Sequence, residues 1–183
     1  MFREGPKIRI GRKLDSLQKD VRGLAAIEFA LIGGLMAIGL VNVADISAFL
    51  FDKVQVNDAT QMAAQAVWAA CDLNHLPAAT KCPAMNSVAA TAVKSTSLGN
   101  AVAIQNGFPL DAYYCPSTSG GLQYVSNYSS PPNNCSAAGN AGIAPGEYVK
   151  VQTTYSYTAM LPGASVVALL PSAITASSWV RLH

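Results

Sequence analysis

The sequence predicts an α+β protein in which a long N-terminal transmembrane helix precedes a small disulfide-stapled domain with a short antiparallel sheet. Three observations favour this fold class. Residues 24–41 form an almost uninterrupted apolar run, residues 148–158 and 174–182 alternate apolar and polar side chains, and four cysteines follow the apolar run. A chain of 183 residues suffices for one domain with an appendage.

The composition narrows the class of protein further. Charged residues make up 12% of the chain, about half of the roughly 25% found in soluble domains. The hydrophobic share of 51% argues against an intrinsically disordered chain. A formal net charge of +2 argues against a nucleic-acid-binding protein, because such proteins carry a strongly basic surface.

The charges are distributed unevenly. Residues 1–23 contain seven Lys or Arg and three Asp or Glu, a net charge of +4, whereas the remaining 160 residues carry −2. A basic head directly before an apolar run is typical of a membrane protein whose basic side faces the cytoplasm. We therefore expect residues 1–23 to form a cytoplasmic leader, and the residues beyond about 45 to lie outside the cytoplasm.

Residues 24–45 are predicted to be the transmembrane helix. The apolar run contains one charged residue, Glu28, and eighteen helical residues extend about 27 Å, close to the thickness of the hydrocarbon core. Ten Leu, Ile, Phe or Val residues contribute roughly −3 to −6 kcal/mol of insertion free energy. A carboxylate near one end of the span costs less than the roughly 3 kcal/mol of a charge at mid-membrane. A buried core helix is the alternative interpretation.

The helix is expected to continue through an extension, residues 46–71. Apolar side chains recur there at helical spacing, and Asp72, Asn74 and Pro77 then provide stop signals. Several of the apolar residues are alanines, which permit close packing. The alanines can pack against the chain's own domain or against a partner helix.

The remaining residues, 72–183, are predicted to form a periplasmic α+β domain. A helix is expected at 83–98 and a short strand at 101–105. Glycine, proline and asparagine are dense in 116–146, which predicts a flexible loop.

The two alternating segments, 148–158 and 174–182, are expected to pair antiparallel across a long connection. Within that connection, Val166–Leu170 is apolar. It can contact a membrane or a partner, or it can fold back onto the core of the domain.

All four cysteines lie on the side of the span that is predicted to be oxidising: Cys71, Cys82, Cys115 and Cys135. Three connectivities are possible, and the sequential one closes two short loops. Each bridge would stabilise the domain by about 3 kcal/mol. Zinc binding is the rival interpretation, but the cysteines lack C-x-x-C spacing and the chain has two histidines, His75 and His183.

Known catalytic motifs are missing from the sequence. It contains no G-x-S-x-G, no H-E-x-x-H and no phosphate-binding loop, and its acidic residues beyond the span are scattered. We therefore expect no enzymatic activity, no cofactor, no metal and no catalytic residue.

The junction between leader and span carries a resemblance. Gly23-Leu24-Ala25-Ala26-Ile27-Glu28-Phe29 resembles the processing site of type IV prepilins: a glycine, four residues, a glutamate and an aromatic residue at the mouth of an apolar helix. The wider stretch, 22–51, and the C-terminal segment, 148–182, are similar to the TadE/TadG-like family of tight-adherence (Flp-type) pilus assembly proteins. Residues 72–147 have no counterpart in this resemblance.

The resemblance implies a role in assembly. A prepilin peptidase would cut after Gly23, and Leu24 would gain a free amine that is mostly cationic at neutral pH. In related pilins the residue equivalent to Glu28, which precedes Phe29 here, meets the new amine of a neighbouring subunit. The short chain is more similar to the TadE type, a pseudopilin or minor pilus component of the inner membrane whose partners are other pilins or pseudopilins and the pilus assembly machinery.

Two other classes of function fit the same sequence. The first is an unprocessed membrane-anchored periplasmic binding or sensing module. The second is an anchored envelope enzyme, against which the missing catalytic motifs argue. For Glu28 itself, the alternative to an assembly role is an interfacial carboxylate that reaches the water at the lipid headgroups.

Overall fold

The structure, a computed structural model, describes residues 21–71, 73–161, 163 and 165–183. The chain divides into two units, Met1–Ala44 and Asp45–His183. Residues 1–20 of the predicted leader lie outside the described residues, and so does the stop signal predicted at Asp72.

Helix α2 is the longest element, running from Val21 to Ala70. It begins three residues before the predicted helix and ends one residue before the predicted end. Alanine and leucine are frequent in it and proline is missing, which favours a continuous helix. Its N-terminal part is long and apolar enough to cross a membrane, and a signal sequence would meet the same criterion.

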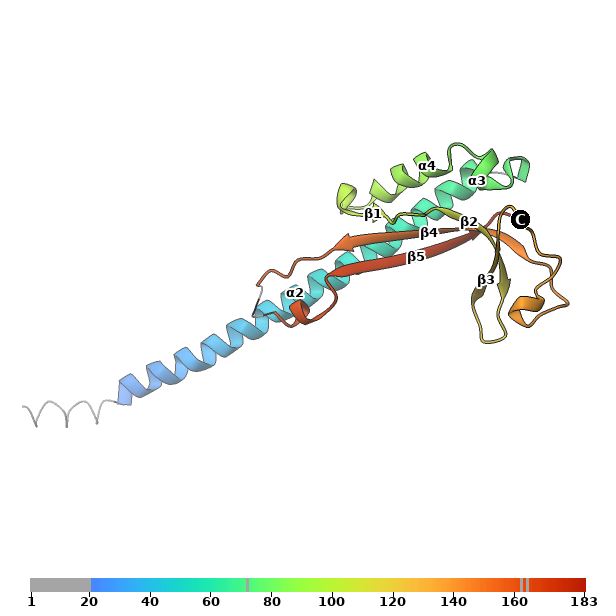
Figure 1. The fold of residues 1–183 in the computed structure, drawn as a ribbon. Helices are drawn as coiled ribbons and strands as arrows, with labels where there is room; N and C mark the ends of the chain where they lie inside the picture. The colour runs from blue at the N-terminus through green and yellow to red at the C-terminus, as the bar shows by residue number, and fades with distance from the viewer. Residues whose placement is uncertain (1–20, 72, 162, 164) are drawn as a thin grey trace, which may run out of the picture. The chain divides into compact units, whose positions relative to one another are not determined.

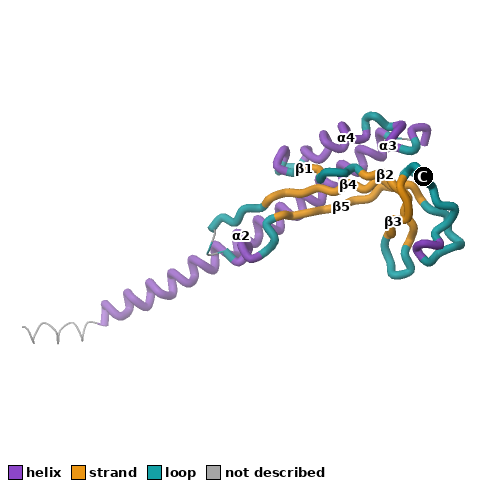
Figure 2. The backbone as a smooth tube through the Cα atoms, viewed as in Figure 1, coloured by secondary structure: helices purple, strands orange, loops and turns teal. Residues whose placement is uncertain are grey.

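Short helices and five strands follow α2 (Figures 1 and 2). The helices beyond α2 are η1 (Leu73–His75), α3 (Ala78–Lys81), α4 (Met85–Ala92), η2 (Val93–Ser95), η3 (Gly99–Ala101), η4 (Ser136–Ala138) and η5 (Val166–Leu169). The strands are β1 (Ala103–Ile104), β2 (Leu110–Pro116), β3 (Leu122–Asn127), β4 (Gly146–Ser156) and β5 (Ala173–Arg181). The α+β class and the small antiparallel sheet are as predicted.

Strand β4 is the centre of the sheet. β5 pairs with it along one edge, from Tyr148 opposite Arg181 to Ser156 opposite Ala173. β2 and β1 share its other edge, and β3 pairs with β2. All these pairings are antiparallel, so the predicted pairing of the two alternating segments is confirmed. Val149, Val151 and Thr153 are buried, whereas the residues between them are partly exposed, which is the pattern of a strand with one face on the core.

The prediction of a flexible loop over residues 116–146 is wrong. This segment contains β3 and η4, and Cys135 lies inside it in a disulfide bond with Cys115. Glycine and proline mark turns in a sequence, but they do not show that a six-residue stretch between two turns will find a strand to pair with. Here β2, which we did not predict as a strand, supplies that partner.

Two other elements are shorter than predicted. The helix expected at 83–98 is α4 followed by the 3₁₀ turn η2, and the strand expected at 101–105 is the two-residue β1. Such differences at the ends of elements are common, because local propensity fixes boundaries poorly.

The core of the second unit lies between the helices and one face of the sheet. Val56, Ala59, Ala63 and Val67 lie on one face of α2 with no solvent exposure, and they belong to the same buried cluster as residues of β4 and β5. In Figure 1, β4 and β5 run alongside this part of α2, and α4 lies beside its C-terminal end. The small alanines therefore pack against the chain's own domain.

A row of hydrogen bonds joins α2 to β4 beside this apolar contact. The hydroxyls of Thr60 and Thr153 lie 2.6 Å apart and are buried. Tyr155 of β4 donates to Asp52 Oδ2 at 3.1 Å, and Tyr157, just after the end of the strand, donates to the carbonyl oxygen of Asp45 at 3.1 Å. These contacts fix the register between the helix and the strand, because each pairs a particular residue of α2 with a particular residue of the sheet.

Two disulfides close the domain, with the sequential connectivity. Cys71–Cys82 links the end of α2 to the residue after α3, and Cys115–Cys135 links the end of β2 to the residue before η4. The second bridge forms a small buried cluster of its own with Ala138 and Val125.

The close contact between α2 and the sheet yields a stability prediction. Ala63→Leu should destabilise the domain by about 1–3 kcal/mol, because the added methylenes overpack a fully buried contact. Ala69→Leu is the matched control, since Ala69 is exposed on the same helix. Thermal unfolding of the detergent-solubilised chain measures both variants, and an equal effect of the two would contradict the proposed packing constraint.

Candidate functional site

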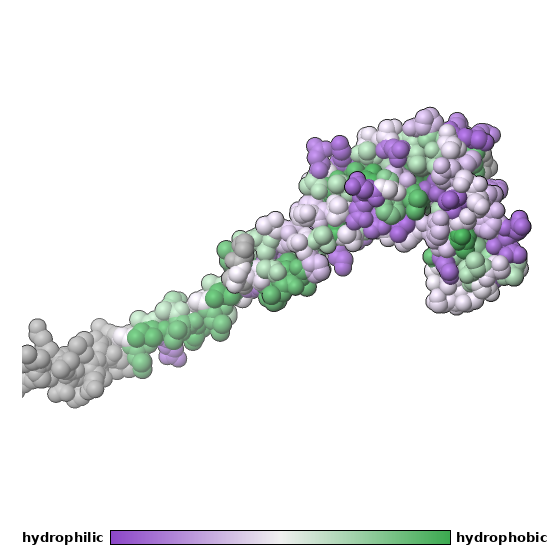
Figure 3. All heavy atoms as spheres, viewed as in Figure 1, coloured by the Kyte–Doolittle hydropathy of each residue, from purple (hydrophilic) through white to green (hydrophobic). Residues whose placement is uncertain are grey.

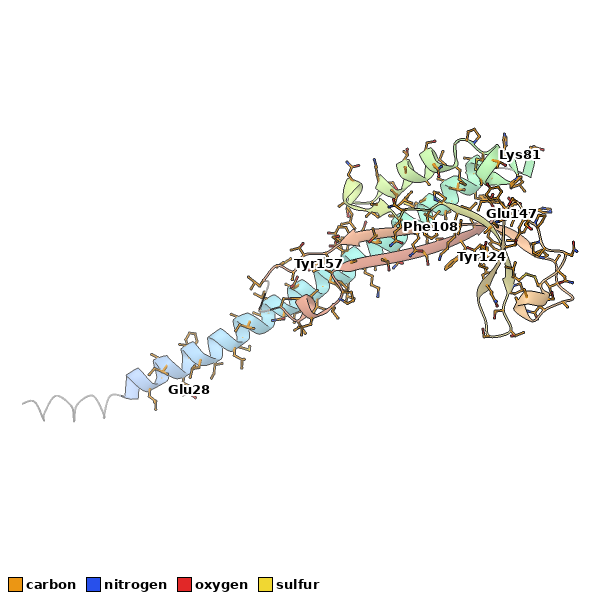
Figure 4. The ribbon with its side chains drawn as sticks, in the orientation of Figure 1. Glu28, Lys81, Phe108, Tyr124, Glu147 and Tyr157 are labelled. Atoms are coloured by element: carbon orange, nitrogen blue, oxygen red, sulfur yellow. A yellow bond between two sulfur atoms is a disulfide. The ribbon has the colours of Figure 1, made fainter. Side chains whose placement is uncertain are left out.

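The predicted processing and assembly residues begin the described part of the first unit. Leu24 and Phe29 are exposed, and Glu28 also lies on the helix surface (Figure 4). Glu28 is one helical turn beyond Leu24, so an amine formed at Leu24 would lie on the same face as the carboxylate. A side chain added at Gly23 would meet no atom within 4 Å. A change at Gly23 therefore leaves the rest of the unit undisturbed.

The surface around Glu28 is almost wholly apolar. Hydrophobic side chains cover the described part of this unit in Figure 3, and its large residues are exposed over the whole run from Leu24 to Val43. An exposed apolar surface of this length is incompatible with water and fits a lipid bilayer or a set of packed helices.

A buried carboxylate, Asp45, is the first residue of the second unit. Its carboxylate accepts hydrogen bonds from the hydroxyls of Tyr157 and Ser165, and from the backbone N–H of Met160 at 3.3 Å. Burial, together with the hydrogen bond to Asp45, raises the pKa of Tyr157 to about 12. Tyr157 therefore remains a donor at neutral pH, and Asp45 holds the start of the β4–β5 connection to α2.

A second buried acidic site lies at the opposite end of β4. Asp111 on β2 and Glu147 on β4 are 2% and 4% exposed, and both carboxyl groups face the short helix α3. The backbone N–H of Ala79 donates to Asp111 Oδ2 at 2.8 Å, and that of Ala78 donates to Glu147 Oε1 at 3.4 Å. Two strands and a helix thus meet at one pair of acids.

Both acids are harder to ionise than ordinary carboxyl groups. Burial raises the pKa of Asp111, and burial together with the neighbouring Asp111 raises the pKa of Glu147. Asp111 Oδ1 is buried and receives no N–H or O–H donor from the described residues. A proton shared with Glu147 would supply that missing donor and would remove the repulsion between two buried negative charges.

Hollows in the second unit are shallow. One of about 400 Å³ is lined by Phe49, Lys53 and the residues around Leu170 and Ile174. The described residues contain no group of three His, Cys, Asp or Glu side chains able to hold a metal ion. His75 lies in η1, and His183 is the last residue.

Sequence reasoning missed both buried acidic sites. In the sequence, Asp45 is the last residue of the predicted transmembrane helix, and Asp111 and Glu147 are among the scattered acids beyond it. The sequence indicates the position of Glu147 alone, because this residue immediately precedes the alternating segment 148–158 that predicts a strand. Its partner is 36 positions earlier in the chain, on a strand that was not predicted.

Comparisons of the chain with models of protein families, with curated proteins and with solved structures found no match.

The raised pKa values of the two acids lead to a pH prediction. The pKa values of Asp111 and Glu147 are raised in the folded chain, whereas the carboxyl groups of the unfolded chain lose their protons near the ordinary pKa of about 4. Above that pH the folded chain therefore binds more protons than the unfolded chain. The free energy of unfolding should then fall as the pH rises from about 4 through the raised pKa values. Glu147→Gln removes one of the two charges and should make the melting temperature less dependent on pH. Each kcal/mol of unfolding free energy corresponds to a shift of about 2–4 °C in the melting temperature.

The measurement is thermal unfolding of the solubilised chain at pH 5 and pH 8. Asp58→Asn removes an exposed acid from α2 and is the charge-matched control. A wild-type chain that is more stable at pH 8 than at pH 5, with Glu147→Gln following it, would exclude the shared proton.

Proposed function

We propose that this protein is a TadE-like pseudopilin or minor pilus component: a structural and assembly protein of a tight-adherence type IV pilus or a related secretion system. In this proposal it is a single-pass protein of the inner membrane. Its N-terminus lies in the cytoplasm and its disulfide-bonded domain in the periplasm. Its partners are a prepilin peptidase, other pilins or pseudopilins and the pilus assembly machinery.

The observation that carries the proposal is the position of Glu28. It is the one charged residue in the exposed apolar run of α2 and lies five residues after Gly23. Anchoring in a bilayer does not require an acid, because the apolar residues already favour insertion and a carboxylate opposes it. Acidic residues retained in a membrane span generally have a partner or a function.

Cleavage after Gly23 would create that partner. The new amine of Leu24 on a neighbouring subunit would be the cation that meets Glu28. The low dielectric of the membrane would make their attraction stronger than it is at a protein surface.

The packing of the second unit supports a division of α2 between two tasks. The alanine face within residues 56–67 is covered by the chain's own sheet. It is therefore not available to a partner helix, and we assign lateral association to the exposed residues 24–44.

Processing gives the first test. In a host that contains the peptidase, the mature protein should begin at Leu24. Gly23→Ala should slow cleavage and Gly23→Val should block it, because the side chain obstructs the protease at the cut. Gly33→Val is the control, since a side chain there also meets no other atom. N-terminal sequencing reads the outcome, and mature protein that starts at Met1 would end the processing proposal.

Glu28→Gln gives the second test, because it keeps the shape of the side chain and removes its charge. The variant should still enter the membrane and still be cleaved, but its crosslinking to pilus components should fall severalfold. Glu28→Asp, which keeps the charge on a shorter side chain, should retain part of it. Membrane fractionation is measured in parallel.

The two tests together separate the candidate functions. Normal crosslinking by Glu28→Gln would leave this residue as an interfacial carboxylate and would favour the anchored binding or sensing module. Loss of membrane insertion would instead contradict the free-energy balance assigned to the span.

A further inference from the structure

The connection between β4 and β5 exposes an apolar surface of its own. Leu169 is 84% exposed, and Met160, Leu161 and Leu170 are also exposed. Val167, between them, is 3% exposed and packs in the core, so one side of the connection holds it to the domain while the other faces outward. No Asp, Glu, Lys or Arg occurs anywhere from residue 151 to residue 180.

Asp45 fixes where this surface lies along α2. The carboxylate of Asp45 accepts hydrogen bonds from Tyr157, Met160 and Ser165, all of which lie in the connection between β4 and β5. The apolar run of α2 that carries no charge beyond Glu28 ends at Ala44, the residue before Asp45, and exposed apolar side chains recur further along the helix at Ile46, Leu50 and Phe51. The connection is thus fastened at the level where the apolar run ends.

We propose that this apolar surface of the connection, formed by Met160, Leu161, Leu169 and Leu170, inserts into the membrane surface as a lipid contact of the second unit. The proposal rests on the proposed function in one respect, namely that residues 24–45 cross the membrane. If they do, Asp45 lies at the boundary between hydrocarbon and headgroups, and the side chains that it fastens there meet lipid.

The chemistry around the connection favours lipid over a protein partner. This surface belongs to a run of thirty residues without a charged side chain, so its insertion beside lipid desolvates no ionised group of that run. The hollow beside it includes Lys53, about 12 Å further along α2 than Asp45. That distance brings an ammonium group near the outer edge of the headgroup layer, where lipid phosphates lie.

The test places a nitroxide label on the full chain in vesicles of phosphatidylcholine and phosphatidylglycerol. Single cysteines are introduced by Leu169→Cys, Leu35→Cys or Ile143→Cys and labelled without reductant, so that the native disulfides stay closed. All three residues are exposed, so each variant should fold. Leu35 reports on the span. Ile143 is the matched apolar control, because it precedes the start of β4 whereas Leu169 follows its end, and the two ends of this strand are about 35 Å apart.

The expected result is a label at position 169 that is severalfold less accessible to a water-soluble nickel chelate, relative to oxygen, than the label at position 143. A label at 35 in lipid with a label at 169 in water would overturn this inference and leave the span intact. Labels that are exposed to water at both position 35 and position 169 would contradict a membrane span at residues 24–45.

The protein-to-lipid ratio separates lipid from a second copy of the chain. Protection of position 169 should persist as the protein is diluted into more lipid. Protection that disappears on dilution would identify another copy of the chain as the occupant and overturn the inference.

Discussion

The contact between α2 and β4 is the constraint on which the rest of the domain depends. Alanine and valine side chains let the helix and the sheet approach closely, and the Thr60–Thr153 hydrogen bond fixes their register inside that contact. β1, β2 and β5 all pair with β4, so a shift of β4 along the helix would displace the whole sheet. Because a packed interior transmits such displacements, a single alanine face holds most of the tertiary structure.

Each end of β4 adjoins a buried acid, and the two acids have different chemical environments. Asp45, near the last residues of the strand, is surrounded by hydroxyl and N–H donors that suit a charged carboxylate. Glu147, at the other end, lies beside a second carboxyl group, and burial together with this neighbour raises its pKa. Asp45 fastens the connection that follows β4 to α2. Glu147 and its neighbour Asp111 join β4 and β2 to α3. The strand is thus tied to helical segments at both ends.

The division of α2 gives these contacts their functional meaning. In the second unit the helix is a platform for the sheet, whereas in the first unit its apolar residues are exposed around a single carboxylate. The domain covers its own stretch of helix and leaves the apolar residues of the first unit exposed, and we propose that lipid and neighbouring subunits cover them. One disulfide fastens the end of α2 to the residue after α3, and the other fastens the residue before η4 to β2.

The sequence by itself determined the helix, the long antiparallel pair, the even set of cysteines and the segment from Gly23 to Phe29. These features depend on local periodicity, composition or spacing, all of which can be read along the chain. Tertiary structure alone decided that the alanines of α2 would face the chain's own sheet, that residues 122–127 would pair with β2, and that Asp111 would meet Glu147. Each of these is a contact between segments distant in sequence. No local pattern encodes such a contact, because its free energy arises only when folding brings both partners together.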